Sequence, residues 1–144
     1  NFRMVRHSQG GPVPADVEVI VGDTMGELVK LMAASDVAFV GGSLEPVGGH
    51  NMLEPLAVGV PVICGPHVFN FAAVAKLLTE QGVMTTVTSP LGLANAAHEL
   101  LSDPARSRAL SAKGIKVVDE HRGALQRLCR IVENVLRDQH ILPG

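Results

Sequence analysis

Short apolar runs alternate with amphipathic segments along most of this chain. Continuous or β-branched apolar runs predict strands at 17–21, 37–40, 60–64 and 83–87. Apolar residues at helical spacing predict a first helix that is capped at residue 23 or 24 and ends at 33–36. The same spacing predicts further helices at about 51–58, 71–81, 90–102, 104–118 and 123–139. Residues 8–16 are rich in glycine and proline and predict a loop. Strands alternating with helices over short loops are typical of βαβ units. We therefore expect an α/β fold: a Rossmann-like open parallel sheet with flanking helices and a helical C-terminal tail.

Three loops carry most of the glycine and polar residues, and each follows a predicted strand. They are residues 22–27, 41–51 and 65–70. In open parallel sheets, ligands bind beside the carboxyl ends of the strands. We therefore expect the three loops to meet at one edge of the sheet and to form a site there.

The segment 39–55 is the most informative, because it runs from a strand through two glycine pairs into a helix. Bare backbone amides beside a helix N-terminus bind anions, and a carboxylate such as Glu54 accepts hydrogen bonds from ribose hydroxyls. Together they indicate a nucleotide site. Other readings stay open: the pairs Gly41-Gly42 and Gly48-Gly49 can simply permit tight turns, Glu54 can complement the helix dipole, and Asn51 can cap the helix. Neither a Walker A loop nor the dinucleotide fingerprint fits.

The other two loops allow similar alternatives. Glu27 lies at capping-box distance from Thr24, or it contacts a ligand. Met25 packs in the core as part of an apolar face with Leu28, Val29 and Met32, or its backbone and that of Gly26 read a base edge. The histidines of the predicted edge, His50 and His67, are structural donors or ligand contacts. His50 and Glu54 have i, i+4 spacing, but two ligands do not make a metal site.

Composition excludes several classes of function. The 144 residues suffice for one domain, 1–144, and 47% of them are apolar. The net charge of −2 and the absence of Trp and Tyr argue against nucleic-acid binding. Cys64 and Cys129 show no metal spacing and are expected to be reduced core thiols, Cys129 on a stripe with Leu125, Leu128, Val132, Val135 and Leu136. We find no signal peptide, no run of the ~18 apolar residues that span a bilayer, and no initiating Met, which suggests an excised piece of a longer protein.

At residues 22–28, 39–54 and 65–71, the sequence closely resembles the 3-deoxy-D-manno-octulosonic acid (Kdo) transferases of lipid A assembly. These are GT-B glycosyltransferases, and the resemblance covers essentially the whole chain but only the C-terminal, nucleotide-binding half of the family. It implies a donor site for CMP-Kdo and a lipid A precursor (lipid IVA) as the acceptor. The family's CMP contacts carry onto Met25, Gly26, Glu27, Asn51, Met52, Leu53 and Glu54. Family members usually have Pro where this chain has Met52, which should soften the helix start slightly.

Within this resemblance, we expect the phosphate of CMP at the turn Gly48, Gly49, His50 and Asn51, and we expect Ser43 and His50 near the donor's sugar or carboxylate. No catalytic residue, metal or cofactor is expected in this chain. The general-base Glu, a Pro-Arg motif, the acceptor surface and a membrane anchor are expected upstream of Asn1. The piece alone should then be soluble and inactive, and the complete enzyme should act on the cytoplasmic side of the inner membrane with its own N-terminal domain as partner.

Two alternatives remain from the sequence. One is another GT-B transferase or a nucleotide-sugar epimerase, which share this half-fold. The other is a non-catalytic nucleotide-binding module that pairs with a partner through its helical tail.

Overall fold

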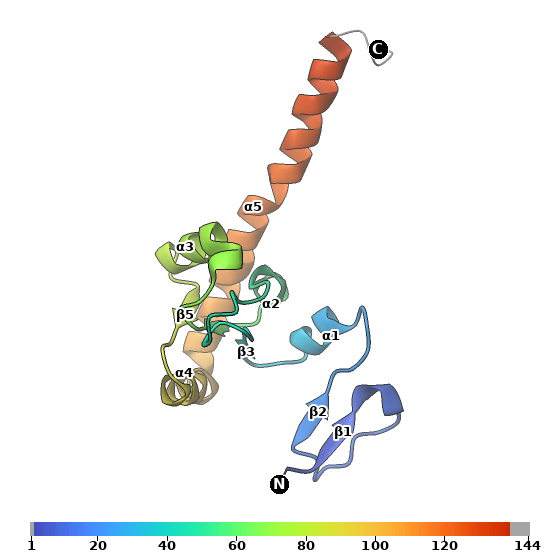
Figure 1. The fold of residues 1–144 in the computed structure, drawn as a ribbon, viewed down its shortest axis with the longest axis vertical. Helices are drawn as coiled ribbons and strands as arrows, with labels where there is room; N and C mark the ends of the chain where they lie inside the picture. Colours follow the sequence, from blue (N-terminus) through green and yellow to red (C-terminus); the bar gives the residue numbers. More distant parts are fainter. Residues whose placement is uncertain (1, 139–144) are drawn as a thin grey trace.

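A computed structural model describes the backbone of residues 2–138 and the side chains of residues 2–121 (Figure 1). Parallel strands alternate with helices along the chain, as the sequence predicts. The strands are β1 (Met4–Arg6), β2 (Val19–Val21), β3 (Ala38–Phe39), β4 (Val62–Cys64) and β5 (Met84–Thr86). The α-helices are α1 (Leu28–Ala33), α2 (Leu53–Ala57), α3 (Ala72–Glu80), α4 (Pro90–Ser102) and α5 (Pro104–Asp138), and single 3-10 turns lie at His7–Gln9 (η1) and Phe69–Phe71 (η2).

The strands form two parallel sheets. One holds β1 and β2, with Met4 opposite Val19, and the other has the order β3-β4-β5, with Ile63 of β4 opposite both Phe39 and Thr85. The expected α/β class is confirmed, but the expectation of one continuous sheet is wrong, because β2 does not pair with β3 in the part of the chain that the structure describes. Figure 1 shows the β1–β2 pair to one side of the three-stranded sheet.

The core lies around β4, whose three residues are all buried. Because side chains alternate across a strand, Val62 and Cys64 join one apolar cluster and Ile63 joins another. The first cluster includes residues of α3 and α5, and the second includes Leu100 of α4. Helices therefore cover both faces of the three-stranded sheet, which explains the continuous apolar run of β4.

The predicted apolar face of α3 is confirmed. Ala75 and Leu78 are buried in the first cluster, and Phe71 and Val74 pack against it. At the end of the chain, one continuous α5 replaces the two helices predicted at 104–118 and 123–139. The proposed core position of Cys129 and its stripe concerns side chains outside the described residues.

Helix α1 differs from the prediction at its start and in its packing. It begins at Leu28, after the predicted cap at Asp23 or Thr24, because Gly26 has a φ of +79° and interrupts the helical path. Its predicted apolar face is not buried: Met25 is 97% exposed and Leu28 is 55% exposed. Packing within this chain therefore does not determine where α1 begins.

Strand β1 was not predicted, because its residues, Met4-Val5-Arg6, do not form an apolar run like those of the other strands. Among the described residues, no helix is both long enough and apolar enough to cross a membrane.

Candidate functional site

Two of the three predicted loops meet beside the sheet of β3, β4 and β5. Residues 41–50 follow β3 and residues 65–70 follow β4, and three hydrogen bonds join them. The amide of Gly65 donates to Ser43 Oγ (2.7 Å), the amide of His67 donates to the Ser43 carbonyl (2.9 Å), and the amide of Asn70 donates to the Gly48 carbonyl (3.3 Å). We call these two loops the paired loops. Their meeting at the ends of neighbouring parallel strands confirms the expected juxtaposition for these two loops, whereas the expectation that the loop 22–27 follows a strand of the same sheet is wrong.

The glycines of the paired loops are needed by backbone conformation and by close packing. Gly42, Gly48 and Gly49 have φ values of +67°, +108° and +71°. A Cβ on Gly48 would lie 2.6 Å from the ring of Phe69, so a larger residue there would push the second loop away. The amide of Gly49 donates to the Gly42 carbonyl (2.9 Å) and closes the turn. This amide is therefore not free to bind an anion.

Asn51 organises the start of α2. Its Oδ1 accepts a hydrogen bond from the amide of Leu53 (3.0 Å), and its Nδ2 donates to Glu54 Oε1 (3.0 Å). Asn51 is not the N-cap of α2, which is Met52, but it forms an Asx turn that satisfies the first amide of the helix. Within the described residues, Glu54 Oε2 and the amides of His50 and Asn51 have no partner. Gly48 and Gly49 of this turn are buried, whereas His50 is exposed and Asn51 and Glu54 are half-buried. The two unpaired amides and the carboxylate of Glu54 can therefore accept a phosphate and hydroxyl groups at the end of the turn.

Four other predicted contact residues differ in what they present to a ligand. His50 is exposed. Leu53 is half-buried against the core, and Met52 is fully buried in it, so a ligand contact of Met52 would have to use its backbone. Ser43 is fully buried as well, and its hydroxyl bonds the Val40 carbonyl and the Gly65 amide. The expectation that the Ser43 side chain touches the donor is therefore wrong for this geometry, in which it joins the paired loops.

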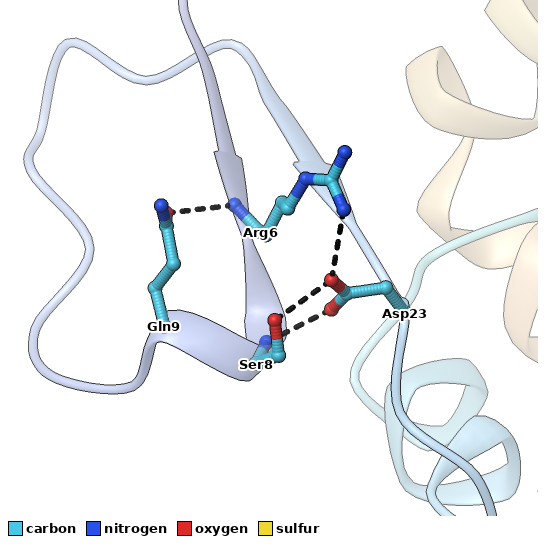
Figure 2. A network of polar contacts seen from close by, with 4 residues as sticks. All are labelled: Arg6, Ser8, Gln9 and Asp23. Carbon is cyan, nitrogen blue, oxygen red and sulfur yellow. Dashed lines mark hydrogen bonds and ion pairs between the residues drawn. The ribbon is translucent and has the colours of Figure 1, made fainter.

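The third predicted loop, residues 22–27, follows β2 and thus belongs to the other sheet. Figure 2 shows what holds its beginning: the Asp23 carboxylate accepts hydrogen bonds from the amide (2.9 Å) and hydroxyl (2.7 Å) of Ser8, and it lies 3.7 Å from Arg6 Nη1. The bonds from Ser8, with a smaller contribution from Arg6, hold the pKa of Asp23 below its ordinary value. Gln9 completes the network by accepting from the Arg6 amide (3.2 Å). Asp23 is thus bonded to the loop after β1 and does not cap α1.

Glu27 lies immediately before α1 and is close to two basic side chains. Its carboxylate is 3.2 Å from His7 Nε2 and 3.8 Å from Lys30 Nζ. The neighbouring Thr24 hydroxyl, followed by His7 and Lys30, lowers the pKa of Glu27, although Thr24 Oγ1 is buried and makes no well-formed hydrogen bond within the described residues. Met25 and Gly26 are exposed, so their backbone is accessible to a ligand. The structure shows no bond between this loop and the paired loops in the part of the chain it describes.

The sequence reasoning missed two features. The network of Arg6, Ser8 and Asp23 joins residues that are distant along the chain, and no local sequence pattern predicts it. A cavity of about 690 Å³ lies between the loop 65–70, α3 and β5, with His67, Phe69, Lys76 and Thr86 in its walls. The apolar residues that line this cavity occupy positions typical of the core of a helix and a strand, so the sequence alone did not indicate a cavity. Among the described residues, no three His, Cys, Asp or Glu side chains are grouped to hold a metal ion.

Comparisons with known proteins agree with this architecture. The chain is 43% identical over 136 residues to the 3-deoxy-D-manno-octulosonic acid transferase of Haemophilus influenzae, covering 94% of this chain and 32% of that protein. It is 38% identical over 132 residues to the enzyme of the same name from Bordetella pertussis, covering 91% of this chain and 31% of that protein. The chain thus spans about a third of the length of these relatives. The resemblance to Kdo transferases is confirmed.

Among solved structures, the C-terminal CMP-Kdo binding domain of WaaA from Acinetobacter baumannii matches with a TM-score of 0.77 and 35% identity, over 81% of this chain and 61% of that one. The profile of the family described as Glycosyl transferases group 1 matches residues 2–117. This match includes the paired loops, the loop 22–27 and every described strand. The chain belongs to the group 1 glycosyl transferases.

Proposed function

We propose that this chain is the donor-binding part of a Kdo transferase, which transfers Kdo from CMP-Kdo to the lipid A precursor (lipid IVA) in lipopolysaccharide biosynthesis. The observation that carries the proposal is the likeness to the CMP-Kdo binding domain of WaaA, at 35% identity and a TM-score of 0.77. The relatives named Kdo transferase support the same activity. The geometry of the paired loops supplies a chemical reason for it.

The proposed donor site uses backbone groups for the phosphate and one carboxylate for the ribose. The unpaired amides of His50 and Asn51 bind the phosphate of CMP, and the buried Gly48 and Gly49 shape the turn that presents these amides. Ribose hydroxyls donate to Glu54, whose orientation is fixed by the hydrogen bond from Asn51. The exposed backbone of Met25 and Gly26, with that of the half-buried Glu27, meets the cytosine base when the donor brings the two sheets' loops together.

The reaction then depends on stabilising a leaving group. An acceptor hydroxyl oxygen forms a bond to the anomeric carbon of Kdo, and the bond from that carbon to the phosphate oxygen of CMP breaks. Negative charge develops on the departing phosphate, and preorganised amides stabilise it without a metal or another cofactor. The acceptor's proton goes to a general base that we place in the N-terminal domain, outside this chain.

In the complete enzyme, the N-terminal domain also supplies the acceptor surface and the anchor that holds the enzyme at the cytoplasmic side of the inner membrane. The partners of this chain are therefore CMP-Kdo, the lipid A precursor and its own N-terminal domain. Nucleic acid is not a partner in this proposal.

Calorimetric titration of this chain with CMP, UDP and GDP tests the donor assignment. We expect CMP to bind more tightly than the other two nucleotides, and a crystal soaked with CMP to show density at residues 48–54. Preference for UDP or GDP would favour a different transferase or an epimerase. No nucleotide binding together with tight self-association would favour a non-catalytic binding module.

A further inference from the structure

We infer that Ser43 is a positioning residue of the donor site, because its buried side chain and backbone fix the loop 65–70 against the turn that is proposed to bind phosphate. The inference rests on the proposed function and deepens it. It makes the loop 65–70 the second wall of the donor site, adjacent to the turn 48–51.

The burial and bonding of Ser43 set it apart. Its side chain is 0% exposed, and it is the one buried polar side chain among the residues whose burial is described. Its hydroxyl donates to the carbonyl of Val40, just after β3, and accepts from the amide of Gly65 (2.7 Å), just after β4. One hydroxyl therefore bonds the ends of two neighbouring strands, and the structure gives it no access to a ligand.

The backbone of Ser43 reinforces this connection. Its carbonyl accepts from the amide of His67 (2.9 Å), so Ser43 supplies two of the three hydrogen bonds that join the paired loops. Its Cβ lies 3.7 Å from the position that a Cβ on Gly49 would occupy. Ser43 is therefore bonded to the loop 65–70 and lies beside Gly49 of the turn 48–51.

The consequence is a fixed relation between the turn 48–51 and His67, which is half-buried in the second loop. Loss of the hydroxyl would leave the Gly65 amide buried without a partner, and the second loop would move to find one. Such a movement changes the position of both walls while the helices of the core stay in place.

Two variants of this chain and a matched control test the inference. S43A removes the hydroxyl, and S43C keeps a similar volume with a much weaker hydrogen-bonding group. S111A is the control, because the half-buried Ser111 hydroxyl bonds only the Ser107 carbonyl of its own helix (3.0 Å). Each protein is titrated with CMP well below its unfolding temperature, and amide hydrogen exchange is followed by NMR.

We expect S43A to bind CMP about tenfold more weakly, the equivalent of one lost hydrogen bond of about 1.4 kcal/mol. Exchange should accelerate at Gly65, His67 and Asn70 while the amides of α4 stay protected. S43C should show the same two changes, and S111A neither.

The outcomes separate the two proposals. If the unsubstituted chain fails to bind CMP, the proposed function falls and the donor role of Ser43 falls with it, whatever the exchange rates show. If the unsubstituted chain binds CMP and S43A binds equally well, the positioning role is overturned while the proposed function stands. Failure of both Ser43 variants to fold would assign Ser43 to stability alone and would also overturn the inference.

Discussion

The side-chain amide of Asn51 donates a hydrogen bond to the carboxylate of Glu54, with 3.0 Å between Nδ2 and Oε1. The same Asn51 side chain accepts from the amide of Leu53, so it is bonded on both sides. Glu54 is thus held in one orientation before any ligand arrives. A carboxylate that is already oriented loses less conformational entropy on binding a ribose.

Replacing Glu54 with Ala should weaken CMP binding about tenfold to a hundredfold, because a hydrogen bond to a charged group contributes about 1.5–3 kcal/mol. Calorimetry on this chain measures the effect. The control is Glu120→Ala, since Glu120 is exposed on α5 and pairs only with Lys116 across one helical turn. Equal CMP affinities for the Glu54 and Glu120 variants would remove the ribose role from Glu54.

A second prediction contrasts two glycines. A Cβ on Gly65 would overlap the backbone of Ser43 and Leu44, whereas a Cβ on Gly26 would meet nothing within 4 Å. Gly65→Ala should therefore destabilise the fold by about 1–3 kcal/mol or more through overpacking, and separate the paired loops. Gly26→Ala should cost only the left-handed backbone strain of about 1–2 kcal/mol, since its φ is +79°.

Urea unfolding of both glycine variants gives the free energies of unfolding, and amide exchange at His67 reports on the paired loops. We expect His67 to lose protection only in the Gly65 variant. Retained protection in that variant would show that the close approach of Gly65 to Ser43 is dispensable.

The relation between sequence and structure differs from element to element. β4 and α3 were predicted well, since the apolar run ending at Cys64 and the spacing of Val74, Ala75 and Leu78 reflect burial in one core. The hydrogen bond between Asn51 and Glu54 could have been predicted from the sequence, because the two residues are only three positions apart. These features depend on neighbours along the chain, which a sequence displays directly.

Other features depend on distant partners and could not be read in the same way. β1 exists through pairing with β2, and Asp23, a predicted helix cap, is bonded instead to Ser8. In both cases the interacting residues, β1 with β2 and Asp23 with Ser8, are separated by more than ten positions along the sequence. Ser43 illustrates the same limit at the site: a serine between glycine pairs suits a ligand contact and a buried bridge equally well, and only its burial decides for the bridge.

The network in Figure 2 predicts a pH dependence. Because the pKa of Asp23 is lowered in the folded protein, its contribution to stability is fully present above the ordinary pKa of 3.8 and is lost as the pH falls through the lowered value. Ser8→Ala removes the hydroxyl bond that is the largest cause of this shift. The pKa of Asp23 should therefore rise toward its ordinary value in this variant.

Carboxyl carbon NMR titration of Asp23 measures that pKa directly. Ser35→Ala is the control, because the Ser35 hydroxyl bonds only the Leu31 carbonyl of α1 (2.9 Å). An unchanged Asp23 titration in the Ser8 variant would mean that the hydroxyl bond does not hold the carboxylate in solution.

The final prediction concerns Cys64, the buried thiol of β4. Its sulfur lies 3.3 Å from the Met84 sulfur, and burial raises the pKa of its thiol, while Thr86 opposes the rise. The thiolate is the reactive form, so native Cys64 should resist a thiol reagent at pH 8 and react fully in urea. The measurement uses a Cys129→Ser background, so that one thiol is counted. Addition of Thr86→Val removes the opposing hydroxyl and should slow the native reaction further. Rapid labelling of Cys64 in the native protein would show that β4 opens to solvent. The central strand would then not be buried in solution as it is in the structure.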